Sequence, residues 1–193
     1  MKWKSAWGRE GTKKEDLNIG NTSLLKLIDE LDQLGFYKYL DYSEDKDKAK
    51  QEAIKTGYIY GDIGREFPAD EEDLSEGGVG AFFEEITPFL RKQGVQLIIN
   101  HENFSEEKYE IQVNGENYTL YSQKDLESEE YIEKNTHRAF SIINKILEES
   151  GSKERLCALY EWNDQIAIFL TNEMYEKIIE LELDKKEIPK RII

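Results

Sequence analysis

Cysteine is almost absent from this chain, because Cys157 is the only one in 193 residues. A single cysteine forms no intrachain disulfide, which excludes the small secreted scaffolds that disulfides hold together. Cys157 stands in the apolar run Leu156–Leu159, a context that raises the pKa of a thiol. We therefore predict that Cys157 is buried and unreactive.

Histidine is scarce, and apolar runs are short. His101 and His137 are the only histidines, and they do not reproduce the two-histidine helical spacing of zinc hydrolases. The acidic run Asp70–Asp73 lacks the alternating oxygen ligands and central glycine of a calcium loop. No run reaches the roughly 18–20 apolar residues of a membrane helix, and residues 1–8 lack the apolar stretch of a signal peptide. We expect no metal, no cofactor and no membrane contact, and we expect the cytoplasm as the compartment.

Catalytic motifs are also missing. The chain has no Gly-x-Ser-x-Gly elbow, and the glycines at 77, 78 and 80 open a predicted helix without the lysine of a phosphate-binding loop. Carboxylate pairs such as Glu84-Glu85 are expected from composition alone, because 41 residues are acidic. We predict a protein that is not an enzyme. An enzyme with two carboxylates facing each other across an acidic cleft remains the alternative.

Negative charge is what the chain has in excess. Its net charge is −15, although residues 1–15 carry +3 and residues 184–193 carry +2, so the segment between them carries −20. Such a field repels nucleic acid and anionic membranes, and it attracts a basic protein partner. The alternative is that the acidity only keeps the protein soluble.

Apolar residues are frequent enough for a packed core, at 38% of the chain, with 11% aromatic residues. Their spacing at three and four residues predicts helices, and their alternation or clustering predicts strands. The predicted helices cover 23–34, 43–56, about 81–93, 129–150 and 172–181. The predicted strands cover 58–60, 95–100, 108–113, 116–121, 154–160 and 165–170. Turn signals at Asn114-Gly115 and Asn163-Asp164 predict two hairpins.

This order of elements predicts an α+β fold, with a mostly antiparallel sheet and helices packed on one face. We expect one domain over residues 1–193, with an irregular lead-in at 1–15 and a basic tail at 184–193. A subdomain break near residue 125, with 123–129 as the hinge, is the alternative.

Residues 64–80 lose periodicity and gain charge, which predicts a long loop, and long loops in compact domains are often functional. Acidic residues of this segment would meet a basic partner, and a tryptophan in a hairpin turn would anchor the contact. The predicted partner-binding residues are Glu66, Asp70, Glu71, Glu72, Asp73, Glu76 and Trp162. A solvated connector is the alternative for the loop, and a core position is the alternative for Trp162.

Two stretches of the chain resemble a family of small acidic bacterial proteins. The first is Glu76–Gly80 followed by Pro88–Leu90 and Gly94-Val95. The second runs through Gly151-Ser152, Glu154–Leu156, Leu159-Tyr160, Asn163-Asp164 and Ile168–Thr171. Together they resemble the immunity-type proteins of polymorphic toxin systems. These shared motifs are caps, turns and strand cores, and they carry no catalytic residue.

The resemblance implies a function in binding. Immunity proteins of this kind hold a toxin domain inactive, often by covering a basic active site with acidic groups. Electrostatic complementarity would then raise the association rate and the specificity. A self-associating structural protein is a further alternative, which a large flat apolar patch would favour.

Overall fold

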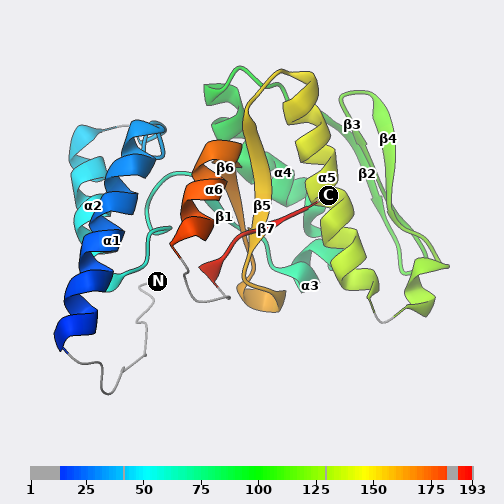
Figure 1. The fold of residues 1–193 in the computed structure, drawn as a ribbon. Helices are drawn as coiled ribbons and strands as arrows, with labels where there is room; N and C mark the ends of the chain where they lie inside the picture. The colour runs from blue at the N-terminus through cyan, green and yellow to red at the C-terminus, as the bar shows by residue number, and fades with distance from the viewer. Residues whose placement is uncertain (1–13, 41, 129, 182–186, 193) are drawn as a thin grey trace.

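The computed structural model describes residues 14–40, 42–128, 130–181 and 187–192, which form an α+β fold with two antiparallel sheets (Figure 1). The helices are α1 (Lys14–Gln33), α2 (Ser43–Thr56), α3 (Glu71–Asp73), α4 (Val79–Lys92), α5 (Tyr131–Glu149) and α6 (Asn172–Glu180). Shorter helical turns are η1 (Leu74–Gly78), η2 (Asp125–Glu127) and η3 (Trp162–Asp164). The strands are β1 (Glu66–Pro68), β2 (Ile99–Phe104), β3 (Tyr109–Val113), β4 (Glu116–Tyr121), β5 (Glu154–Leu159), β6 (Ile166–Thr171) and β7 (Lys190–Arg191).

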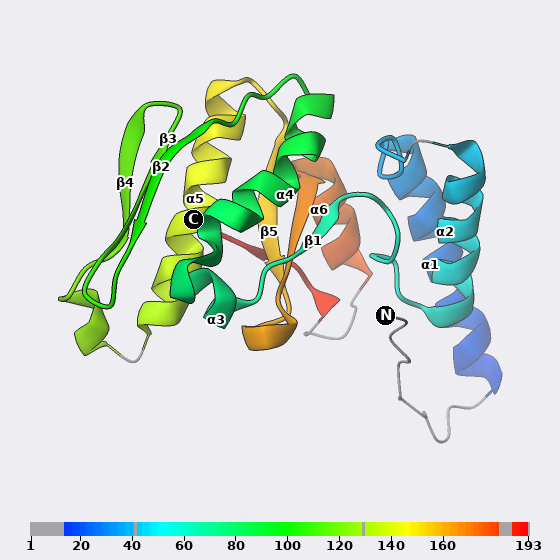
Figure 2. The ribbon, with the colours of Figure 1, turned by 180° about the vertical axis from the view of Figure 1, so that it is seen from behind.

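The elements lie in layers. One sheet has the order β1-β6-β5-β7 and the other has the order β2-β3-β4. Figures 1 and 2 show α1 and α2 at one end of the molecule, β2, β3 and β4 at the other end, and α4 and α5 between the two sheets. The predicted α+β class and antiparallel pairing are confirmed. The prediction of helices on one face is wrong for the four-stranded sheet, which helices cover on both sides.

The reason lies in β5 and β6, which are apolar on both faces. Leu156 and Ala158 of β5 belong to a core shared with α4, α5 and the three-stranded sheet. Cys157 and Leu159 point the other way, into a second core with α1, α2 and α6. Strands that are apolar on both faces have to be covered on both faces. Cys157 is buried, as predicted.

Both predicted hairpins are present. The β3–β4 turn has positive φ at Asn114 (50°) and Gly115 (85°), the conformation that an Asn-Gly pair favours in a two-residue turn. Strands β5 and β6 also pair as a hairpin. The β5–β6 connection contains the single helical turn η3, so Asn163-Asp164 is part of a longer loop than a tight turn.

Other boundaries differ from the predictions. Helix α1 begins at Lys14, so the predicted irregular lead-in ends earlier, and residues 1–13 lie outside the described residues. Residues 58–60 do not form a strand. Residues 95–98 are not a strand either, although Val95 and Leu97 are buried in alternation, because Ile98 N–H donates to the Asn114 side chain and strand pairing begins only at Ile99.

The predicted long loop at 64–80 is wrong. The chain there forms β1, α3 and η1 before α4 begins. Asp70 is the N-cap of α3, and its carboxylate accepts hydrogen bonds from the backbone N–H groups of Glu72 and Asp73. Acidic residues in a first turn favour a helix, because they complement the positive end of its dipole. Much of the charge that suggested a loop, from Asp70 to Asp73, therefore belongs to a helix start.

The predicted basic tail includes strand β7, which pairs with β5, while residues 184–186 and 193 lie outside the described residues. The core between the sheets contains residues on both sides of position 125, from Ala69 to Phe169. Within the described part of the chain, no helix combines the length and the apolar character needed to cross a membrane.

Candidate functional site

Two of the predicted partner-binding residues have roles inside the fold. The Glu66 carboxylate accepts hydrogen bonds from the backbone N–H groups of Ile63 (3.2 Å) and Arg65 (2.9 Å). Burial raises the pKa of Glu66 above its ordinary value, although these backbone donors act in the opposite direction. Asp70 caps α3. Neither carboxylate is simply exposed to an incoming partner.

The remaining predicted residues gather around α3 and η3. Glu72, Asp73 and Glu76 are exposed, whereas Glu71 is buried. Asn163 of η3 donates a hydrogen bond to Glu72 (3.4 Å), so α3 and η3 lie side by side. Trp162 begins η3, but its side chain lies outside what the structure describes. The fold thus brings two separated predicted segments together.

A pocket of about 410 Å³ opens beside this junction. Segments far apart in the sequence line it, namely α3, the first turns of α5 with Glu130 just before them, the ends of β5 and β6, and β7. Its charged side chains are Glu71, Glu130, Glu133, Glu161 and Lys190. Four glutamates against one lysine leave a formal charge of −3 when His137, which also lines the pocket, is counted as neutral. In Figure 1, α3, the start of α5 and the β5–β6 turn lie in the lower part of the molecule, and residues of these segments line the acidic pocket.

Ion pairs position the outer carboxylates of the acidic pocket. Glu130 pairs with Lys134 (3.1 Å), and Glu161 pairs with Lys190. Glu133 lies 3.8 Å from the His137 ring, one helical turn away. Exposed pairs of this kind contribute little to stability, about 0–1 kcal/mol. These ion pairs do fix the positions of the Glu130 and Glu161 carboxylates at the edge of the acidic pocket.

Gln165 forms the buried part of the pocket. Its side-chain amide donates to Glu71 at 2.5 Å, and the residue is only 5% exposed. A carboxylate only accepts hydrogen bonds, so the NH₂ group of Gln165 has to face Glu71 and the amide oxygen has to face away. That oxygen, Oε1, is buried and has no hydrogen-bond partner among the described residues. It is one of five buried side-chain atoms of the described residues that have no hydrogen-bond partner, so it does not by itself mark a binding site.

Sequence reasoning found part of this site. It named Glu71 as a partner-binding residue but placed it on a long loop, and it did not name Gln165 or Glu133 as site residues. A glutamine directly before the apolar strand Ile166–Thr171 is the only local signal for a buried amide at this position. No local sequence pattern indicates that the first turns of α5 pack next to α3.

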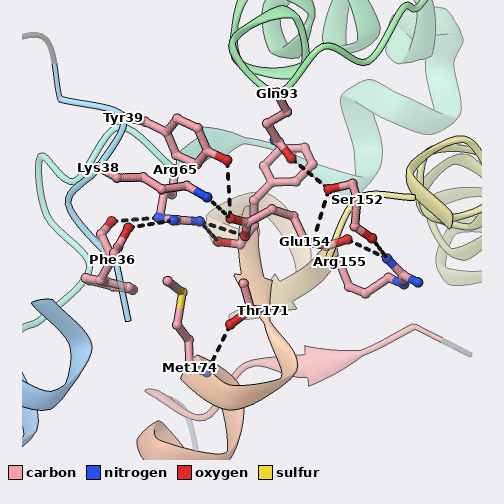
Figure 3. Close-up of polar contacts among 12 residues, drawn as sticks. Phe36, Lys38, Tyr39, Arg65, Gln93, Ser152, Glu154, Arg155, Thr171 and Met174 are labelled. Atoms are coloured by element: carbon pink, nitrogen blue, oxygen red, sulfur yellow. Dashed lines mark hydrogen bonds and ion pairs between the residues drawn. The ribbon is translucent and has the colours of Figure 1, made fainter. Parts of the chain in front are cut away.

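A second hollow, a groove of about 960 Å³, lies beside a buried ion pair. Arg65 is fully buried, and its Nη1 donates to Glu154 Oε2 at 2.7 Å. Lys38 and the Tyr39 hydroxyl also reach Glu154, each at 3.4 Å (Figure 3). These groups satisfy one another. Gln93 also lines the groove, and its side-chain NH₂ group is buried and has no hydrogen-bond partner among the described residues.

The other donors of Arg65 explain what the ion pair does. They bond to the carbonyl oxygens of Gly35 (3.0 Å), Phe36 (2.6 Å) and Phe169 (3.0 Å). The first two carbonyls follow the end of α1 at Gln33, and the third belongs to β6. The guanidinium therefore ties the α1–α2 end of the molecule to the central sheet, which is a structural role.

Comparison with family models, curated proteins and solved structures finds no match to this chain. Among the described residues, no group of three or more His, Cys, Asp or Glu side chains is arranged to hold a metal ion.

Proposed function

We propose that this protein is a non-catalytic binding protein for a basic protein partner, and that it acts as an immunity-type inhibitor that neutralises a cognate toxin domain in the cytoplasm. The acidic pocket carries the proposal, because the residues that line it have a formal charge of −3. A negatively charged lining suits a positively charged group. A nucleic acid or an anionic membrane would be repelled by the same charge.

The surface next to the acidic pocket has the same sign. Glu72, Asp73 and Glu76 are exposed on α3 and η1, and α3 supplies Glu71 to the pocket. A basic partner that covered the pocket would meet these carboxylates at the rim of the interface. Rim charges mainly change the association rate and its dependence on salt.

Self-association through one apolar face is less well supported. Within the described ranges, the exposed large apolar side chains are Leu25, Leu34, Tyr42, Ile54, Ile98 and Phe104. The first four belong to the α1–α2 end, whereas Ile98 and Phe104 lie at the two ends of β2 in the three-stranded sheet. These regions are at opposite ends of the molecule (Figure 1).

Association kinetics with the partner test the proposal. The partner is first captured from a native lysate on the immobilised full chain, identified by mass spectrometry and purified. A triple variant, Glu72→Gln/Asp73→Asn/Glu76→Gln, should then associate several-fold more slowly at low salt, with a flatter salt dependence. The variant should stay folded, because exposed substitutions usually change the free energy of unfolding by no more than about 0.5 kcal/mol.

A matched control removes three negative charges at the distant end of the molecule. Glu44→Gln/Asp47→Asn/Glu52→Gln on α2 changes the net charge equally, so it separates the local contribution from the total charge. Its association rate should be closer to that of the unmodified protein. Equal slowing by both variants would remove α3 from the interface, and a neutral or acidic partner would overturn the proposed function.

A further inference from the structure

We propose that Asn114 is a deamidation site that the fold keeps closed, so that the reaction proceeds only from states in which residues 96–100 have left the β3–β4 turn. Asn114-Gly115 is the one Asn-Gly pair in the chain. Both residues are exposed, so water reaches them. The inference concerns the chemistry of this chain alone, and its test needs no partner.

The Asn114-Gly115 pair combines two features that favour deamidation. Asparagine is among the thermally labile residues, and a following glycine has no Cβ atom to shield its backbone nitrogen. In the reaction, the Gly115 nitrogen loses its proton and bonds to Asn114 Cγ, while the Cγ–Nδ2 bond breaks and ammonia leaves. Water then opens the cyclic imide at either carbonyl carbon, which gives aspartate or isoaspartate. The net reaction consumes water and releases ammonia, with no oxidant or reductant.

The fold holds the Asn114 side chain at both ends of its amide. Asn114 Oδ1 accepts the Ile98 backbone N–H at 2.9 Å, and Asn114 Nδ2 donates to the Gln96 carbonyl oxygen at 3.0 Å. Only this orientation fits, because an amide oxygen has no hydrogen to donate to a carbonyl. The Asn114 backbone N–H also donates to the Ile98 carbonyl oxygen at 2.9 Å. Rotation of Asn114 Cγ toward the next backbone nitrogen therefore has to break bonds to residues 96–98.

The attacking nitrogen is held as well. The Gly115 N–H donates to Asn100 Oδ1 at 2.8 Å, so the proton that has to leave is engaged by an acceptor from β2. Strand β2 has a register shift between Ile99 and His101, which leaves Asn100 as the extra residue of a bulge. Bulges of this kind re-aim a side chain. The bulge thus brings Asn100 to the turn, where it opposes both deprotonation and attack.

The product of the reaction does not restore the closed turn. Aspartate at position 114 has no NH₂ group, so a carboxylate oxygen would face the Gln96 carbonyl oxygen in place of the present donor. Isoaspartate would lengthen the backbone by one carbon within the turn that sets the register of the hairpin. Residues 96–98, which lead from α4 into β2, would lose an anchor on the turn. A transient opening would thus become permanent.

Peptide mapping by mass spectrometry tests the inference on the full chain. The native protein and the same protein in guanidinium chloride are incubated at one temperature and one mildly alkaline pH. Conversion at Asn114 is followed over time, with fragmentation that separates isoaspartate from aspartate. We expect the native protein to convert at least about tenfold more slowly, because several hydrogen bonds have to break first. Equal rates in the two states would overturn the inference.

Variants assign the protection to Asn100. Asn100→Ala removes the acceptor of the Gly115 N–H and should speed conversion of the native protein several-fold. The control is Asn103→Ala, at an exposed position of the same strand, which should leave the rate unchanged. Circular dichroism checks that both variants are folded. The inference is overturned if the two variants convert equally fast, or if Asn100→Ala keeps its advantage in guanidinium chloride, where the acceptor has no defined position.

The consequence of the reaction is tested with Asn114→Asp, which reproduces the aspartate product. The control Asn117→Asp adds the same charge at an exposed position of β4 in the same hairpin. Asn114→Asp should lower the midpoint of thermal unfolding more than Asn117→Asp does, because only the first change removes the donor to Gln96. Equal midpoints would show that the product still closes the turn and would overturn this part of the inference.

Discussion

Arg65 shows how a single residue can join two parts of this fold. It is fully buried, pairs with Glu154, which is 2% exposed, and donates to carbonyls that follow α1 and to one in β6. Removing one partner of a buried ion pair leaves the other charge without compensation. The carbonyl oxygens would also lose their donors.

We predict that Arg65→Met lowers the free energy of unfolding by about 3–5 kcal/mol. The control is Lys38→Met, because Lys38 reaches the same Glu154 carboxylate from an exposed position. An exposed pair contributes at most about 1 kcal/mol, so the control should cost much less. Denaturation in urea measures both values. Equal costs for the two variants would contradict the structural role assigned to Arg65.

At the scale of elements, the start of α4 depends on a carboxylate from the neighbouring sheet. The Gly80 N–H donates to Glu102 Oε1 of β2 at 2.8 Å, and the Val79 N–H donates to the Tyr109 hydroxyl of β3 at 2.9 Å. A Cβ atom at position 80 would lie 2.1 Å from Glu102 Oε2, which is closer than any real contact. Glycine lets β2 approach the helix closely enough to cap it.

We predict that Gly80→Ala destabilises the protein, although the same change inside an ordinary helix stabilises it by about 1 kcal/mol. The added methyl group displaces the Glu102 carboxylate and breaks its bond to the helix start. In a double-mutant cycle with Glu102→Ala, the penalty for Gly80→Ala should shrink or change sign, because the clash is gone. Thermal unfolding of the four proteins measures the cycle, and additive effects would refute this account.

At the scale of the whole molecule, β5 and β6 are shared by two cores. One core contains α4, α5 and the three-stranded sheet, and the other contains α1, α2 and α6. If the central sheet unfolds, both cores lose the strands that cover one of their sides. The two halves of the chain on either side of residue 125 should therefore unfold together.

The reactivity of the Cys157 thiol can test whether the two halves unfold together. Cys157 is buried in the central sheet, and burial raises the pKa of its thiol to about 12, so little thiolate is present at neutral pH. We predict slow labelling of the native protein by a thiol reagent. As denaturant is added, the labelling midpoint should coincide with the midpoint from far-UV circular dichroism. Rapid native labelling, or a labelling transition at lower denaturant, would show that the α1–α2 end opens on its own.

Local patterns by themselves determined several elements of this protein. Helix α2 spans Ser43–Thr56 as predicted, because its acidic first turn and Gly57, with a φ of 79°, act within a few residues of the chain. The β3–β4 turn at Asn114-Gly115 and the Thr171 cap of α6 were predictable for the same reason. The antiparallel α+β class followed from these short-range signals.

Other features of the protein depend on contacts between residues far apart in the sequence, and only the tertiary structure shows them. Strand β1 has three residues and exists because Glu66 pairs with Ile168 about one hundred positions later, and a partner at that distance leaves no local pattern. Glu71 was predicted to lie on a long loop, but it is buried, and Gln165, 94 residues away, donates a hydrogen bond to its carboxyl group. The charge of the candidate site is therefore a property of the sequence. Its shape arises when α3, α5, β6 and β7 pack together, because hydrogen bonds and burial between distant residues set the position of each acidic side chain.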